Sequence, residues 1–469
     1  MLDAMNLGPP ATRLPSLCSV ASVAVLAVLH GTPRSTGAAI HHVAADGSGD
    51  FLAVQAGIDA AAAGDTLRIA PGTYEEHLLI DGKDLLLEGT TGAEVTFLDG
   101  QYSGRVLTVL SAPGGVTLRG LTIQHGVMSG VEINDQGGGV AAFLTALTVE
   151  DCVFRDNGAS SRGAGLVVGI FAPPGSPGTV ASAAGIPSLT VSRTLFLDNL
   201  CGGSGGGIHC DEVPSLLVDC TFIGNHAGGT GGGVDLLQQS HRMEHCVFQG
   251  NSGFLGAGVA MVGDGVLSLT DVVFQDNVSD NFGGGLWSVN GGGVVLEQVR
   301  FLRNQADRGG GLYLARVPLL ASRVLFRGNH AVDRGGGVYF DQVSSALLDH
   351  STWIENTAPR GTSLWAYAGT LSFTACILGD EDGSAVECSS GTTVSSSCTV
   401  GGLGTGYCVD FAARRSIVPC EGSPELLCTV PSPGSCGPVG YAEALCPAPS
   451  CGTPARPATW GGIKALYRP

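Results

Sequence analysis

The feature that most constrains the fold is a short motif that returns at a nearly constant interval. An aromatic residue, two variable residues and an asparagine occur eight times, as FRDN, FLDN, FIGN, FQGN, FQDN, FLRN, FRGN and WIEN. After a first gap of 42 residues, successive asparagines are 25 to 27 residues apart. They are Asn157, Asn199, Asn225, Asn251, Asn277, Asn304, Asn329 and Asn356. A period of this length predicts a solenoid in which each repeat packs on its neighbours.

Short strands rather than helices fill each repeat. Each asparagine is followed, five or six residues later, by a triplet of small residues such as GGG or GAG. The residues after the triplet alternate with the period of a strand, as in LYLA and VYFD. Glycine, at 74 of 469 residues, suits tight turns between such strands. We therefore predict an all-β parallel β-helix over residues 66–378, with about a dozen coils of about 26 residues stacked about 4.8 Å apart.

The repeated side chains should form columns along such a solenoid. The asparagines predict a ladder of stacked amides that bond one another and the turn backbone. The aromatic residues of the motif predict an inward stack, and Cys152, Cys220 and Cys246, two residues before their aromatics, also point inward. Cys220 and Cys246 are neighbours in this stack, where either a disulfide or two free buried thiols would fit.

The paired motifs F-x-x-N and G-G-G-[ILV], from about residue 157 to residue 365, resemble two groups of repeat proteins. They are similar to right-handed parallel β-helix (pectin-lyase-like) proteins and to polymorphic outer membrane proteins, and this resemblance implies a fold rather than an activity. The segment VAADGSGDFLAVQAGIDAAAAGDTLRIAPGTYEE resembles the start of pectinesterase-like proteins. That likeness implies an N-terminal cap over residues 40–65, with a short helix that turns Val54 and Ile58 inward.

The two ends of the chain differ from the repeats. Arg13 and the apolar run of residues 17–29 predict a signal peptide over residues 1–39, and hence a secreted or cell-surface bacterial protein. No later apolar run approaches about 20 residues, so we expect no transmembrane segment in the mature chain. Nine of the 15 cysteines lie between Cys376 and Cys451, which predicts a disulfide-bearing segment over residues 379–451. Residues 452–469 form a C-terminal tail.

Charge and spacing exclude several kinds of site. The net charge is −18 and there are two lysines, so nucleic acid is not an expected partner. The glycine triplets precede strands, whereas a phosphate-binding loop precedes a helix. His226 and His330 hold the same turn position four coils apart, too far for one metal ion. We therefore expect no metal and no cofactor, with calcium relevant only to a lyase.

Two columns are the candidate ligand-binding residues. At the second position after the triplet, which should point outward, His209 and Asp235 occur in earlier coils, and aromatic residues occupy the last four coils. A basic column lies five residues before three of these aromatics. The aromatic column is Trp287, Tyr313, Tyr339 and Trp365, and the arginine column is Arg308, Arg334 and Arg360. Planar rings and bidentate donors suit acidic or sulfated sugars, but the same columns could be structural, or covered by loops.

No catalytic constellation stands out in the repeats. A lyase needs calcium-binding carboxylates and a base, and a glycosidase needs paired carboxylates on one face. The outward column offers Asp235 with no second carboxylate beside it. The sequence therefore predicts a non-catalytic adhesion or glycan-contacting rod whose partner is a polysaccharide or cell-surface glycan. A polysaccharide lyase or esterase is the first alternative, and a passive surface-layer or spacer protein is the second.

Overall fold

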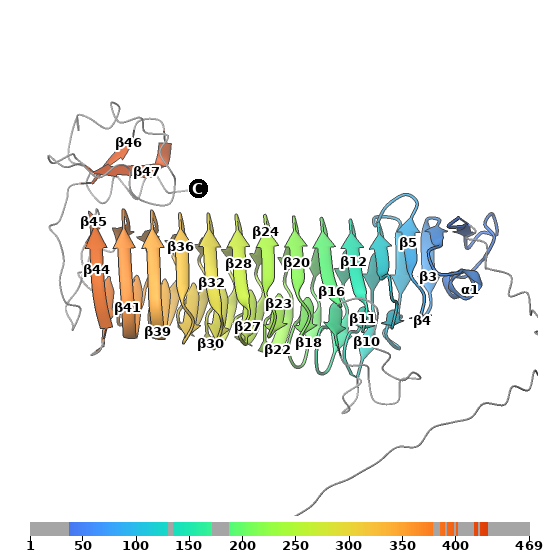
Figure 1. Ribbon diagram of the computed structural model, residues 1–469, viewed down its shortest axis with the longest axis horizontal. Helices are drawn as coiled ribbons and strands as arrows, with labels where there is room; N and C mark the ends of the chain where they lie inside the picture. The colour runs from blue at the N-terminus through green and yellow to red at the C-terminus, as the bar shows by residue number, and fades with distance from the viewer. Residues whose placement is uncertain are drawn as a thin grey trace, which may run out of the picture. The chain divides into compact units, whose positions relative to one another are not determined.

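The predicted solenoid is present. The computed structural model describes residues 37–129, 135–170, 187–378, 385–389, 392–397, 400–401, 417–420 and 423–429. The chain winds as a right-handed parallel β-helix, and its coils are stacked along one axis (Figure 1). The strands form three long sheets of 24, 13 and 8 strands. Each strand pairs in parallel with the equivalent strand of a neighbouring coil, which confirms the predicted fold class.

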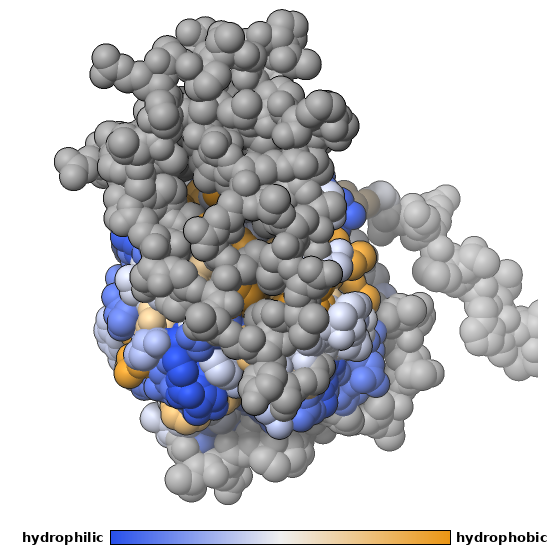
Figure 2. All heavy atoms as spheres, turned by 90° about the vertical axis from the view of Figure 1, so that its left-hand side faces the viewer, coloured by the Kyte–Doolittle hydropathy of each residue, from blue (hydrophilic) through white to orange (hydrophobic). Residues whose placement is uncertain are grey.

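One coil shows how the repeat becomes structure. The strand that carries the motif aromatic, β33 (Arg300–Leu302), belongs to the 13-stranded sheet, and β34 (Gln305–Arg308) belongs to the 8-stranded sheet. The strands after the triplet, β35 (Leu312–Ala315) and β36 (Leu319–Ser322), belong to the 24-stranded sheet. Inward side chains from Val43 to Val394 form one continuous apolar core. Figure 2 views the molecule from the left-hand side of Figure 1 and shows hydrophilic and hydrophobic residues side by side on that face.

The N-terminal segment contains the expected short helix. Strand β1 (Ile40–Val43) pairs with β2 (Thr66–Ile69), and helix α1 (Val54–Ala60) lies between them in the chain. Val54 and Ile58 are buried in the core, as predicted. The helix contacts β1, β2 and β4 (Leu78–Asp81). Its role as a cap on the solenoid remains a prediction.

The asparagine ladder is present from Asn157 to Asn356, and all eight side chains are buried. The Oδ1 atom of Asn251 accepts hydrogen bonds from the backbone N–H and the side-chain amide of Asn225, both at 3.0 Å. Its own amide donates to the Phe222 carbonyl and to Asn277 Oδ1, again at 3.0 Å. The ladder therefore bonds each turn both to the next turn and to the strand of the previous coil.

The motif aromatics form the predicted inward stack. From Phe154 to Phe326, neighbouring ring centroids are 4.7 to 5.0 Å apart and the planes are within 13° of parallel. Trp353 continues the stack at 5.2 Å. The spacing of the rings is close to the rise of one coil, so the column holds successive coils in register.

The cysteines beside this stack are structural turn residues. Cys220 and Cys246 are free buried thiols, so the disulfide alternative is wrong for this pair. Each thiol donates to the carbonyl two residues upstream, at 3.3 and 3.2 Å. Thr194 and Ser351 occupy the same position in other coils and make the same bond at 2.8 and 3.0 Å. The thiol therefore substitutes for a hydroxyl at a buried turn.

The glycine triplets have two separate causes. The first glycine has positive φ, +65° at Gly309 and +68° at Gly335, and reverses the chain there. The other two lie against the next coil, since a Cβ on Gly310 would be 2.4 Å from a backbone oxygen and one on Gly311 2.7 Å. The reversal folds the strand before the triplet over the outer face of the strand after it. We call this two-layer unit, which forms at the triplet of a coil, the arch.

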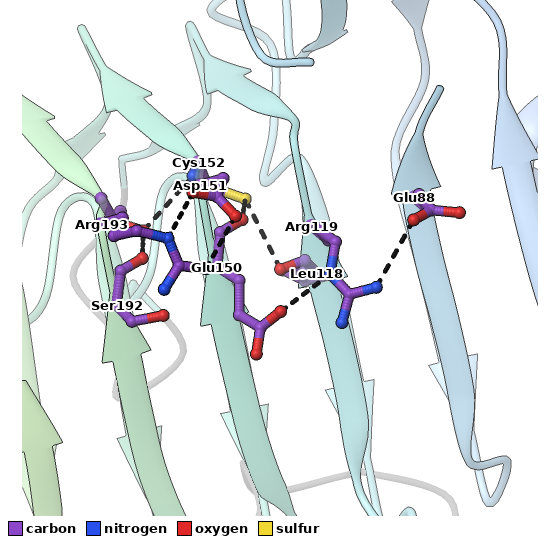
Figure 3. A network of polar contacts seen from close by, with 9 residues as sticks. Glu88, Leu118, Arg119, Glu150, Asp151, Cys152, Ser192 and Arg193 are labelled. Carbon is purple, nitrogen blue, oxygen red and sulfur yellow. Dashed lines mark hydrogen bonds and ion pairs between the residues drawn. The ribbon is translucent and has the colours of Figure 1, made fainter. Parts of the chain in front are cut away.

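A ladder of alternating charges runs along the outer face of the N-terminal coils. Arg119, on β8 (Val116–Arg119), lies 3.4 Å from Glu88 of β5 (Leu85–Gly89) and 2.8 Å from Glu150 of β12 (Ala146–Glu150). Figure 3 shows these three residues on neighbouring strands. Exposed pairs of this kind contribute about 0–1 kcal/mol each. If a strand were displaced by one coil, side chains of like charge such as Glu88 and Glu150 would lie next to each other. This ladder of charges therefore favours the correct register.

Several predictions on the ends of the chain lie outside the described residues. These are the signal peptide, most of the cysteine-rich segment and the C-terminal tail. Cys388 is disulfide-bonded, and β46 (Ile417–Cys420) pairs antiparallel with β47 (Ser423–Thr429). The predicted framework of disulfides and the domain boundaries therefore stay predictions. Among the described residues, no helix is long and apolar enough to cross a membrane.

Candidate functional site

The aromatic column stands in the predicted register. Trp287 lies on β31 (Leu286–Val289) and pairs with Tyr313 of β35. Tyr313 pairs with Tyr339 of β39 (Val338–Asp349), which pairs with Trp365 of β41 (Leu364–Thr374). These side chains point away from the main core and belong to a second, separate apolar cluster. The strand period therefore predicted both the column and its direction.

The structure corrects the expectation that this column is an open contact surface. Trp287, Tyr313 and Tyr339 are only 8%, 5% and 5% exposed, and Trp365 is partly buried. The arch covers them: Phe282 stacks on Tyr313 with centroids 4.6 Å apart, and Tyr313 stacks on Tyr339 at 5.0 Å. A sugar ring cannot reach the faces of the buried rings, so the alternative of a covered column is confirmed.

The arginine column forms the outer layer over the aromatic column. The Arg308 guanidinium lies over the rings of Phe282 and Tyr339, at 5.5 and 5.9 Å from their centroids. Arg334 and Arg360 both lie over Trp365, at 4.8 and 5.5 Å. These three side chains are 35%, 26% and 45% exposed, so solvent reaches all of them. The rings therefore act as a platform that positions the guanidinium groups.

One carboxylate serves all three arginines. Asp333 accepts a hydrogen bond from Arg308 Nε at 2.9 Å and one from Arg360 Nη2 at 2.9 Å. Arg334 Nε is 3.5 Å from the same carboxylate, and Asp307 lies 3.8 Å from Arg308. Burial opposes ionisation of Asp333. The hydrogen bond from Arg360, the charge of Arg334 and the contact with Arg308 nevertheless hold the pKa of that carboxyl below its ordinary value.

Earlier coils fill the arch with a polar network instead. His209 Nδ1 lies 2.8 Å from Asp235 Oδ2, and both residues are 1% exposed. The Thr230 hydroxyl donates to Asp235 Oδ1 at 2.6 Å, and it is 2.9 Å from the Ser204 hydroxyl. His209 and Asp235 stand in the outward column of Trp287, as expected, but they are buried rather than open to solvent. Because this pair is buried so deeply, a substrate cannot reach it. The pair is instead part of the packing inside the arch.

No group of three or more histidine, cysteine or acidic side chains suited to a metal ion is present within the described ranges. The arginine column carries three positive charges against Asp307 and Asp333, a local surplus of one in a chain whose net charge is −18. Such a surface can bind an anionic group through its N–H donors.

Two stretches of the chain, residues 108–306 and 257–418, match the family described as "Right handed beta helix region". Together they span residues 108–418, which is 311 of the 469 residues. The chain belongs to this right-handed β-helix family. No match was found among curated proteins.

Two solved structures are similar to this right-handed β-helix protein. The pectin methylesterase from Aspergillus niger is 11% identical, with a TM-score of 0.23 over 80% of this chain and 88% of that one. The pectin methylesterase from carrot is 12% identical, with a TM-score of 0.24 over 79% and 88%. Likenesses at such scores carry no argument about activity.

The covering layer is the part of the site that the sequence argument missed in this right-handed β-helix protein. Leu255 and Phe282 hold the same position before the triplet as Arg308, and the backbone register places all three in one column. The same position holds Ser204 and Thr230 in earlier coils. A comparison of that position across the coils could have shown small polar residues beside His209 and Asp235, and apolar residues or arginine beside the aromatic column.

Proposed function

We propose that this protein is a secreted or cell-surface β-helix rod that binds an acidic polysaccharide through Arg308, Arg334 and Arg360, without catalysing a reaction. The arginines, rather than the aromatic residues, are the contact groups. The observation that supports this is a row of three partly exposed guanidinium groups that share the carboxylate of Asp333. Guanidinium donors match the geometry of carboxylate and sulfate groups.

A row of arginines with an excess of positive charge is unusual in this molecule, whose net charge is −18. Several other arginines are balanced one to one by a carboxylate of a neighbouring coil, as in the two hydrogen bonds of Arg193 to Asp151 and of Arg303 to Asp276. Each guanidinium has five N–H donors. Asp333 accepts one hydrogen bond from Arg308 and one from Arg360. Donors therefore remain on this face for an anionic ligand.

The test is retention on an acidic polysaccharide gel. The protein with Arg308→Gln, Arg334→Gln and Arg360→Gln combined should lose about tenfold or more in apparent affinity, because charge-assisted contacts are lost. The matched control combines Arg193→Gln, Arg303→Gln and Arg316→Gln, which removes the same charge from positions outside the arginine column and should bind within about twofold of the parent. Equal retention of both variants would contradict the proposal.

A passive spacer is the second candidate function, and the burial of the aromatic column favours it. If the columns serve only to hold coils together, the parent and the arginine variant will be retained to the same extent on the gel, and the variant will unfold at a lower denaturant concentration. Measuring circular dichroism and urea unfolding on the same samples separates the two functions. A loss of binding with an unchanged unfolding midpoint supports the glycan contact and excludes the spacer.

A further inference from the structure

We infer that the arginine column binds a linear acidic glycan lying parallel to the solenoid axis, with one anionic group on each of three successive coils. This inference rests on the proposed function and adds the shape, direction and length of the ligand. Three features support it: the pairing of the three arginines in neighbouring coils, the aromatic rings beneath their guanidinium groups, and the residues next to the row.

The register sets the direction of the ligand. Arg308 pairs with Arg334 in adjacent strands, and Arg334 pairs with Arg360 through an isolated bridge. Adjacent strands are about 4.8 Å apart, so the backbones of the three arginines span about 10 Å along the axis. A compact anion could contact two of these side chains, whereas a chain that runs along the axis contacts all three. The geometry therefore favours a polymer over a single sugar.

The aromatic rings beneath the guanidinium groups limit the motion of these hydrogen-bond donors. Each guanidinium lies over at least one aromatic ring, and the rings of Phe282, Tyr313 and Tyr339 are themselves stacked. Cation–π contact and burial of the aliphatic stems restrict the rotamers before a ligand arrives. Binding therefore loses less side-chain entropy than it would at free surface arginines.

The covering residues of the preceding coils limit the length of the arginine row. In the coil before Arg308 the covering position is Phe282, and one coil earlier it is Leu255, so the row of positive charge ends there. On this side the row therefore begins at Arg308, and within the described residues it comprises the three guanidinium groups of Arg308, Arg334 and Arg360.

The experiment measures affinity against ligand length, using the full chain and size-defined oligouronates of one to eight residues. Sulfated oligosaccharides and oligonucleotides of the same lengths serve as parallel probes. We expect the Kd to fall about 30-fold or more between monomer and trimer, and by less than about threefold between hexamer and octamer. The sulfated series should show the same length dependence, because the arginines recognise the anionic group rather than the sugar.

The central arginine supplies the decisive variant. Arg334→Gln should weaken trimer binding about tenfold and change monomer binding by less than about threefold, because it interrupts the row. Arg303→Gln is the matched control and should change neither. If Arg334→Gln does not fold, Arg334→Lys keeps the charge and should still weaken the trimer, since lysine lacks the planar fork.

The outcomes distinguish this inference from the proposed function. If no acidic glycan binds, both the inference and the proposed function are wrong. If the glycans bind but affinity is independent of length, or continues to rise steeply beyond the hexamer, the inference falls and the proposed function stands. If oligonucleotides bind more tightly than glycans of equal length, the assignment of the ligand as a glycan is overturned.

Discussion

Removing one rung of the asparagine ladder gives the sharpest test of what holds the coils together. Asn251→Ala deletes two donors and one acceptor that take part in four hydrogen bonds of 3.0 Å. The Asn225 backbone N–H then loses its Oδ1 acceptor in a buried turn, which costs about 1–3 kcal/mol. The other three lost bonds add about 1 kcal/mol each. We therefore expect a loss of about 4–6 kcal/mol in the free energy of unfolding.

The assay combines urea unfolding with hydrogen exchange. Gln305→Ala is the matched control, because Gln305 is exposed and directly follows the ladder residue of its coil. That variant should lie within about 0.5 kcal/mol of the parent. Solenoids can unfold by parts, so faster exchange of the Asn225 amide supplies a local reading. A loss below about 1 kcal/mol for Asn251→Ala, with normal exchange at Asn225, would refute the view that the ladder carries this stability.

Two further predictions concern buried titratable groups. Burial lowers the pKa of His241 to about 4, so the folded state loses stability as the pH falls from 6.5. The loss at pH 4 is about 3 kcal/mol relative to neutral pH. His241→Leu should remove that part of the dependence in urea titrations, and an unchanged slope between pH 6.5 and 4 would contradict it. For the turn thiols, Cys220→Ser should change unfolding by less than about 1 kcal/mol, because a hydroxyl makes the same turn bond. Cys220→Ala should cost about 1–2 kcal/mol, and a serine variant as unstable as the alanine variant would argue against the turn role.

The ladder and the aromatic stack could be predicted because they depend on a strict period. Once Asn225 and Asn251 occupy the same place in successive coils, stacking follows from the rise of a strand pair. The same logic placed Trp287 above Tyr313 in one column. It also placed Cys220 beside Cys246, but it could not choose between a disulfide and two free thiols. That choice depends on the local turn, where each sulfur already has a carbonyl acceptor.

The covering of the aromatic column could not be predicted in the same way. Alternation along a strand says which face a side chain takes, and not whether another layer lies above it. Here the covering depends on the backbone at Gly283 and Gly309, whose positive φ turns the preceding strand back over the next one. The sequence shows a glycine at each of these positions, but a glycine there is compatible with several turns.

The arch separates the part of the repeat that must stay constant from the part that can vary. The ladder asparagines and the stacked phenylalanines contact the coils on both sides, so a substitution in one coil disturbs three coils. A covering residue contacts mainly the outer column, and its chemical type differs from one coil to another. Thr230 covers Asp235, Phe282 stacks on Tyr313, and Arg334 lies over Trp365. Only in the last of these pairs does the covering side chain bring a charge to the surface. A new contact surface can therefore arise by exchange of one covering residue per coil, while the ladder and the core remain intact.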